Sequence, residues 1–205
     1  REAVITSPPK VSRALIAYYN DPNPLVKANC QEFLAQVSAS TQEEICRSFT
    51  EHESPVALQI CQRYGYIPKE PALRAVYLFL SGEIEEYLAF DFDTSILQSV
   101  YRTAQPNVKR RIAEIVRTSG LTELLPILTG SGLQEAVARA DSLTLDTLLH
   151  VLSENNDAEG LWKLVDDVPV RYLSEILGNL SRMNFSPTNP ADVETLARIS
   201  EQISS

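Results

Sequence analysis

Apolar side chains recur along this chain at the spacing of an α-helix. One face of a helix over residues 106–117 would carry Val108, Ile112, Ile115 and Val116. Two later segments repeat the arrangement, with Leu145, Leu148, Leu149 and Leu152 in the first and Leu173, Ile176, Leu177 and Leu180 in the second. The alternation typical of strands is almost absent. The pattern therefore predicts an all-α fold of about fourteen short helices, most of them about 8 to 15 residues long.

Glycine and proline mark where these helices end and begin. Gly65, Gly82 and Gly120 each follow a helical run, where a left-handed residue is favoured. The residues that open helical segments include Pro24, Pro71, Pro106 and Pro169. Proline suits the first turn because the N–H that it lacks would be unpaired there anyway. The apolar run Ala72–Leu80 predicts a helix that is buried on several sides.

The segments that begin with proline also resemble one another. "PLVKANCQEFL" from residue 24 and "PNVKRRIAEIV" from residue 106 align without gaps. A third copy, "PALRAVYLFL" from residue 71, keeps the proline, the apolar residue two positions later and the basic residue after it. The offsets of 47 and 35 residues bracket the roughly 40 residues of two-helix repeats. Short helices in such repeats stack to bury their apolar faces.

Residues 18–34 resemble a HEAT repeat, and the residues that carry the resemblance are Asp21, Val26 and Lys27. The resemblance implies a superhelical stack of antiparallel helical hairpins, a HEAT-like α-solenoid with about seven pairs of helices. In that family the acidic and basic residues help to tie successive repeats together. The second and third copies keep the basic residue but have Pro68 and Thr103 in place of the aspartate, which would interrupt such a ladder.

A longer resemblance covers Gly65–Arg117. This stretch is similar to a helical segment that precedes a WD-repeat β-propeller in large bacterial proteins. The pieces "GYIP", "FLSG", "EEYLAFDFD" and "RRIAE" carry the likeness, which continues more weakly through residues 161–177. The tryptophan expected in that family near "SGEIEEYL" is missing here. The resemblance implies a non-catalytic scaffold or protein-interaction module of a larger protein, with the propeller outside this sequence.

The domain organisation follows from these segments. We expect a linker at residues 1–10, the HEAT-like solenoid at 11–182, a second linker at 183–189 and a terminal helix at 190–205. That helix would cap the stack or begin the connection to a further domain. The chain begins at Arg1 and shows no signal-peptide core, so we expect a piece of a longer cytoplasmic protein.

Composition narrows the possible partners. The 18 basic and 27 acidic residues leave a formal charge of −9, which disfavours nucleic acid. No apolar run approaches the ~18 residues of a membrane helix. The three cysteines, Cys30, Cys46 and Cys61, are an odd number without close spacing in the sequence, which fits a reducing compartment and no zinc site. Cys30 aligns with Ile112 and is therefore expected in the core.

Residues for acid–base chemistry are few. His52 is expected at a helix end and His150 beside a leucine-rich stripe. The segment 91–93 contains two carboxylates, and we interpret Asp91 or Asp93 as the cap of a helix. A hydrolase or lyase would require Glu86, Asp91 and Asp93 to converge on one pocket. We expect no cofactor and no metal.

Two interpretations of function in the binding class stay open beside this enzyme hypothesis. The first is the interaction scaffold, which would bind another protein or an adjacent domain along the face of the second helices, including those that begin at residues 24, 71 and 106. The second is a regulatory domain that recognises an acidic or phosphorylated peptide. Its basic residues would line one edge if the repeats stack in register: Lys27, Arg74, Lys109 and Arg110.

Overall fold

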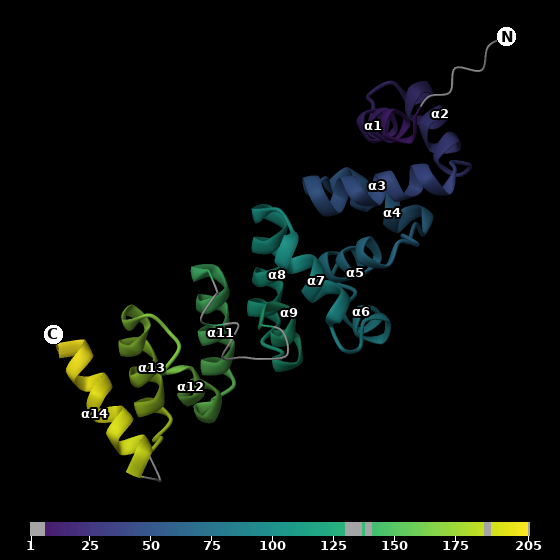
Figure 1. Ribbon diagram of the computed structural model, residues 1–205. Coiled ribbons are helices and arrows are strands. Elements are labelled where there is room, and N and C mark those ends of the chain that lie inside the picture. The colour runs from purple at the N-terminus through teal and green to yellow at the C-terminus, as the bar shows by residue number, and fades with distance from the viewer. Residues whose placement is uncertain (1–6, 130–136, 138–140, 187–189, 205) are drawn as a thin grey trace. The chain divides into compact units, whose positions relative to one another are not determined.

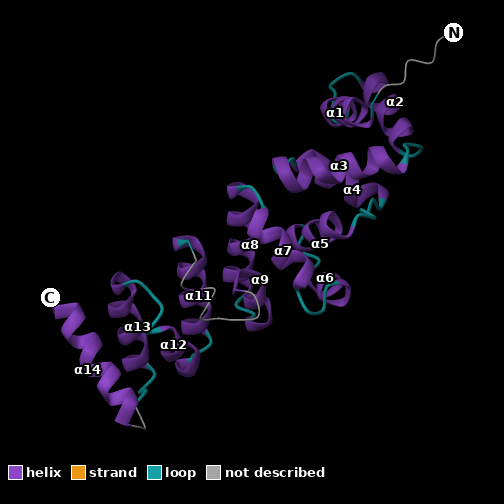
Figure 2. Cartoon of the chain, viewed as in Figure 1, coloured by secondary structure: helices purple, strands orange, loops and turns teal. Residues whose placement is uncertain are grey.

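The part of the chain that the structure describes consists of helices joined by turns and loops. The computed structural model describes residues 7–129, 137, 141–186 and 190–204, and it contains no strand in these ranges (Figures 1 and 2). The prediction of an all-α fold is thereby confirmed. The chain divides into two compact units, Arg1–Lys109 and Arg110–Ser205. The boundary between them falls inside a helix.

The first unit contains seven helices in its described part and the start of an eighth. They are α1 (Pro8–Tyr18), α2 (Pro24–Leu34), α3 (Ala39–His52), α4 (Pro55–Tyr64), α5 (Pro71–Leu80), α6 (Ile84–Phe90), α7 (Ser95–Thr103) and the beginning of α8 (Pro106–Ser119). The first helix therefore begins three residues before the expected position 11, since Pro8 and Pro9 both fit a first helical turn.

The helices of the first unit contact one another in a regular order. Consecutive helices pack in the pairs α1–α2, α3–α4 and α5–α6, and the odd-numbered helices form the contacts α1–α3, α3–α5 and α5–α7. The helix that begins at Pro71 is thus α5, a member of the odd-numbered row, whereas α2 is not. Our expectation that the segments from Pro24 and Pro71 occupy equivalent second-helix positions is wrong.

The burial of α5 explains its position. Seven of its ten residues are buried, because α3, α6 and α7 cover it from different sides. Phe79 is fully buried, and its ring meets that of Tyr87 on α6 edge-on, with the centroids 5.0 Å apart. The prediction of a helix buried on several sides at Ala72–Leu80 is confirmed. The local motif of proline, apolar residue and basic residue indicates where a helix starts. Which helices it packs against depends on the apolar surface of the whole helix.

The second unit contains the remainder of α8 and the elements after it, which pack against one another in sequence. They are η1 (Thr122–Leu124), α9 (Leu125–Thr129), α11 (Ser142–Glu154), α12 (Ala158–Leu164), α13 (Val170–Arg182) and α14 (Pro190–Ser204). The helix α12 contacts both α11 and α13, and α13 contacts α14. Trp162 of α12 packs against Phe185 and donates a hydrogen bond from Nε1 to Asp192 Oδ1 of α14, over 3.1 Å. This contact and an ion pair between Arg198 and Asp166 fix α14 to its unit.

The helix ends use the expected residues. Gly65, Gly82 and Gly120 follow α4, α5 and α8 with φ values of 66°, 86° and 65°, so the three predicted left-handed positions are confirmed. Side chains cap several N-termini, as when Asp157 Oδ1 accepts a hydrogen bond from the Gly160 N–H of α12 over 2.8 Å. The terminating residues of short helices are therefore specified locally.

Substitution by alanine at two helical glycines of the second unit should change the free energy of unfolding in opposite directions. A Cβ at Gly160 would lie 2.5 Å from Asp157 Oδ2 and 2.9 Å from Leu152 Cδ2, whereas one at Gly178 would meet nothing within 4 Å. Gly160→Ala should lower the free energy of unfolding by about 1–3 kcal/mol because the cap and the core must both shift. Gly178→Ala should raise it by about 1 kcal/mol through helix propensity. Urea unfolding followed by Trp162 fluorescence measures both, and a stabilised Gly160→Ala would contradict the clash.

Candidate functional site

A pocket opens between three helices of the first unit, and we call it the α3–α5–α7 pocket. Its volume is about 370 Å³. Residues of α3 and α5 form one part of its lining, and residues of α7 and the segment leading into α8 form the other. Its lining includes Arg47, Thr50, Glu51, Glu70, Leu73, Val76, Val100, Thr103, Gln105 and Val108.

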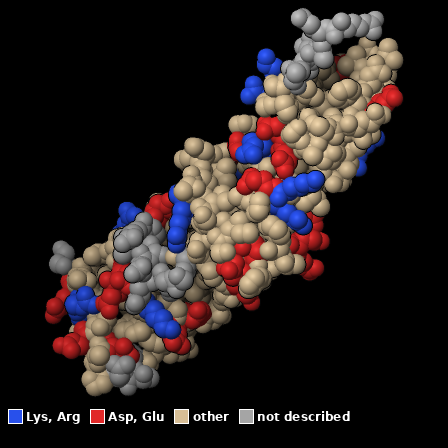
Figure 3. Space-filling model, turned by 45° about the vertical axis from the view of Figure 1, so that its right-hand side comes forward, with Lys and Arg blue, Asp and Glu red and all other residues tan. Residues whose placement is uncertain are grey.

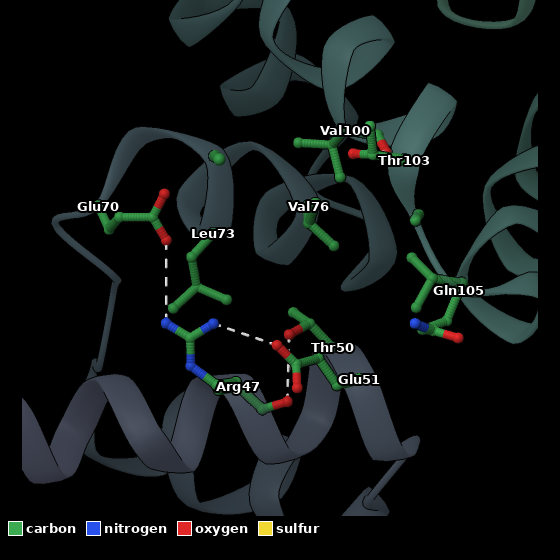
Figure 4. Close-up of a pocket in the computed structure, with 12 residues that line it drawn as sticks. Arg47, Thr50, Glu51, Glu70, Leu73, Val76, Val100, Thr103 and Gln105 are labelled. Carbon is green, nitrogen blue, oxygen red and sulfur yellow. Dashed lines mark hydrogen bonds and ion pairs between the residues drawn. The ribbon is translucent and has the colours of Figure 1, made fainter.

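The charged side of the pocket is centred on Arg47. Its guanidinium lies 3.1 Å from Glu51, 3.7 Å from Glu44 and 4.0 Å from Glu70, and Figure 4 shows it held between the last of these and Glu51. Burial opposes the charge of this guanidinium, but the hydrogen bond to Glu51 and the three carboxylates outweigh it and raise the pKa of Arg47. Three carboxylates around one guanidinium leave a local excess of negative charge.

The pocket lining also contains aliphatic side chains, one of which, Leu73, lies beside Glu70 and Arg47 (Figure 4). Leu73 and Val76 come from α5, and Val100 comes from α7 (Figure 4). Val108 of α8 adds to this aliphatic part of the lining, and Asn107 beside it donates a hydrogen bond from Nδ2 to the Glu51 carbonyl over 2.9 Å. A lining that combines aliphatic side chains with carboxylates suits a ligand group with an aliphatic stem and a positively charged end.

A second hollow lies between α1 and α2, with a volume of about 380 Å³. Its walls include Val11, Val26 and the half-exposed rings of Tyr18 and Phe33, and Lys10 is the one charged residue in its lining. This hollow can exclude water but offers few polar groups to orient a ligand. The α3–α5–α7 pocket combines both properties and is therefore the stronger candidate.

The four basic residues proposed for peptide recognition lie on three helices and line neither hollow. Lys27 is exposed on α2, and the guanidinium of Arg74 on α5 stacks over the Phe90 ring at 4.6 Å. Lys109 lies 5.7 Å from the Tyr101 ring, and Arg110 is an exposed residue of the second unit. On the face that Figure 3 displays, basic side chains lie singly or in small groups among acidic ones.

Two of the three acidic residues of the enzyme hypothesis cap a helix. The Asp91 carboxylate is buried and accepts hydrogen bonds from the N–H groups of Ile96 and Leu97 at the start of α7. Asp93 accepts one from the Ser95 N–H, and its hydrogen bonds with Ser95 lower the pKa of its carboxyl. Glu86 is exposed on α6, and none of the three acids lines either hollow. The interpretation of Asp91 and Asp93 as capping residues is confirmed.

The histidines lie where the sequence indicated. His52 is exposed at the last position of α3, and His150 is half-buried on α11. Cys30 is buried, in agreement with its expected place in the core. Among the described residues, no group of three or more histidine, cysteine, aspartate or glutamate side chains is arranged to hold a metal ion.

Two cysteines that are far apart in the sequence lie close together in space. Cys46 on α3 and Cys61 on α4 have their sulfur atoms 3.4 Å apart. The sequence held a signal for this contact. The two positions are equidistant from the turn at Glu53 and Ser54, so a hairpin folded there brings them opposite each other.

No helix in the described ranges combines the length and the apolar character that crossing a membrane requires. Comparisons of the sequence with protein-family models and with curated proteins, and of the structure with solved structures, find no match.

Proposed function

We propose that this chain is a non-catalytic protein-interaction scaffold built from HEAT-like helical repeats. Its docking site is the α3–α5–α7 pocket, which receives a lysine or arginine side chain of a partner protein. The observation that carries the proposal is the composition of this pocket, which combines the aliphatic side chains of Leu73, Val76 and Val100 with the carboxylates of Glu51 and Glu70.

The helix contacts of the first unit support the HEAT-like part of the proposal. Paired consecutive helices and an odd-numbered row in contact are expected when hairpins stack side by side. Such stacks bind partners through surfaces and grooves formed by successive helices rather than through a single loop. A place in a larger bacterial WD-repeat protein, with an adjacent propeller as one possible partner, rests on the sequence resemblance at Gly65–Arg117.

The charge of the pocket supports a cationic occupant. Arg47 neutralises one of the three carboxylates around it, so the cluster keeps a negative charge that attracts an incoming ammonium or guanidinium group. The aliphatic stem of the same side chain would replace water against Val76 and Val100. Both groups of interactions are needed, because surface ion pairs alone contribute little.

Peptide selection tests the proposal without a known partner. Peptides selected from a random library on the intact chain should be enriched in lysine or arginine. Glu51→Gln combined with Glu70→Gln should weaken binding of a selected peptide by about tenfold or more, as measured by fluorescence anisotropy. The matched control is Glu85→Gln combined with Glu86→Gln on α6, which should change the affinity by less than about twofold.

The outcome also discriminates between the binding interpretations. Selected peptides that are acidic and lose affinity in Lys27→Ala and Arg74→Ala would overturn the pocket and favour the basic edge. Peptides without any charged residue that bind equally to all variants would favour apolar docking elsewhere. For the pocket, affinity should fall moderately as salt rises, because the charged contacts are half-exposed.

A further inference from the structure

The pair of thiols in the α3–α4 hairpin has no part in the proposed docking. Cys46 and Cys61 are both fully buried, and their sulfur atoms are 3.4 Å apart. The Cys46 thiol lies 3.8 Å from the Tyr66 carbonyl and donates to it, so the Cys61 thiol is the donor toward the Cys46 sulfur. The third cysteine is occupied elsewhere, since Cys30 donates to the Leu15 carbonyl over 3.4 Å.

We propose that Cys46 and Cys61 form a reversible intramolecular disulfide when the chain meets a two-electron thiol oxidant. A disulfide has its sulfur atoms about 2.05 Å apart, so they must approach by little more than 1 Å from their present 3.4 Å. The two residues face each other across one hairpin with a short connection. Bond formation therefore requires movement within this hairpin, where α3 and α4 pack against each other, and breaks the contact of Cys46 with the Tyr66 carbonyl.

The reaction balances with an azo compound such as diamide as the oxidant. The thiolate of one cysteine adds to one nitrogen of the N=N bond, and the other nitrogen takes up a proton. The second thiolate then attacks the sulfur of the adduct, forms the S–S bond and displaces the hydrazine, which takes the second proton. Two S–H bonds are lost, one S–S bond is gained, and the two electrons reside in the hydrazine.

The environment of the pair makes the reaction slow and selective. The hydrogen bond with Cys46 and then burial raise the pKa of the Cys61 thiol, so this thiol is protonated at neutral pH. The oxidant reaches the sulfur atoms when the hairpin opens locally, and the rate should rise with pH as the thiolate fraction rises. Once joined, the cysteines close a loop of about 15 residues, which restricts the unfolded chain.

The experiment treats the intact native chain with diamide at pH 8, blocks remaining thiols with iodoacetamide after denaturation, and measures the mass. We expect two alkylated thiols fewer and the loss of two hydrogen atoms, in a chain that stays monomeric. Digestion with trypsin and a glutamate-specific protease should yield a cross-linked peptide pair containing Cys46 and Cys61, with Cys30 alkylated. The melting temperature should rise by about 5–10 °C and return after reduction.

Single substitutions locate the bond. Cys30→Ser should still lose two thiols, whereas Cys46→Ser and Cys61→Ser should not form the cross-link. Because serine at position 46 or 61 places a hydroxyl in the core and destabilises the chain, the decisive readout is the chain with all three cysteines and its Cys30→Ser variant. Three alkylated cysteines after treatment, a bond that includes Cys30, or a cross-link formed only in denaturant would overturn the proposal.

Discussion

Asp91→Ala is expected to lower the free energy of unfolding of the first unit by about 3–4 kcal/mol. The carboxylate is 2% exposed and accepts three hydrogen bonds, from the N–H groups of Ile96 and Leu97 at 3.1 and 3.0 Å and from Tyr87 Oη at 3.1 Å. Each hydrogen bond to a charged group contributes about 1.5–3 kcal/mol, and the substitution leaves buried donors without an acceptor. Burial and then the neighbouring Asp91 raise the pKa of Tyr87, so its hydroxyl stays protonated as the donor.

Urea unfolding followed by far-ultraviolet circular dichroism measures the loss. The matched control is Asp93→Ala, because this carboxylate stands at the same helix end but is exposed and accepts from the Ser95 N–H. Its effect should be much smaller. Asp91→Asn keeps one acceptor oxygen and should fall between the two. Equal effects of Asp91→Ala and Asp93→Ala would show that the buried cap does not stabilise this unit.

Phe79→Ala should be as damaging, with an expected loss of about 3–5 kcal/mol. The ring is fully buried and meets Tyr87 edge-on with an interplanar angle of 75°, which adds to the burial of its surface. Helices α3, α6 and α7 all contact α5, so they hold the resulting cavity open from several directions. Because the surrounding helices cannot close this cavity, the substitution loses the packing contacts of the ring as well as the free energy of transferring it out of water.

The comparison for this substitution is Phe92→Ala, because Phe92 is 84% exposed and should change the free energy of unfolding by less than about 0.5 kcal/mol. Thermal unfolding followed by circular dichroism compares the two variants. Trp162 belongs to the second unit, so its fluorescence separates the unfolding of that unit from the first. If Phe79→Ala behaved like Phe92→Ala, α5 would not be the centre of the first unit's core.

The sequence was sufficient to predict where the helices lie along the chain, but not which helices pack against one another. The spacing of apolar residues, the proline at position 71 and the glycine at position 82 act within one or two helical turns. They therefore predict where α5 begins and ends. The same local signals occur at Pro24, yet α2 and α5 pack differently. How a helix packs depends on how many neighbouring helices cover it. The continuous apolar run after Pro71 predicted the burial of α5 on several sides, whereas the proline at its start did not.

The candidate pocket could not be predicted because its residues come from segments far apart in the sequence. Arg47 pairs locally with Glu44 and Glu51, which helical spacing indicates, but Glu70 and Val100 reach it through the contacts of α3, α5 and α7. The role of Asp91 and Asp93, in contrast, could be predicted from the sequence. Aspartate just before a helix start is a local capping signal, and the structure uses both residues in that way.

The position of the unit boundary within α8 has a consequence for dividing this protein. Cleavage between Lys109 and Arg110 would sever a continuous helical hydrogen-bond ladder. Four carbonyls and four amides along the cut would lose their partners. A viable half-length fragment would have to carry all of Pro106–Ser119, so that the two halves overlap in sequence by one helix.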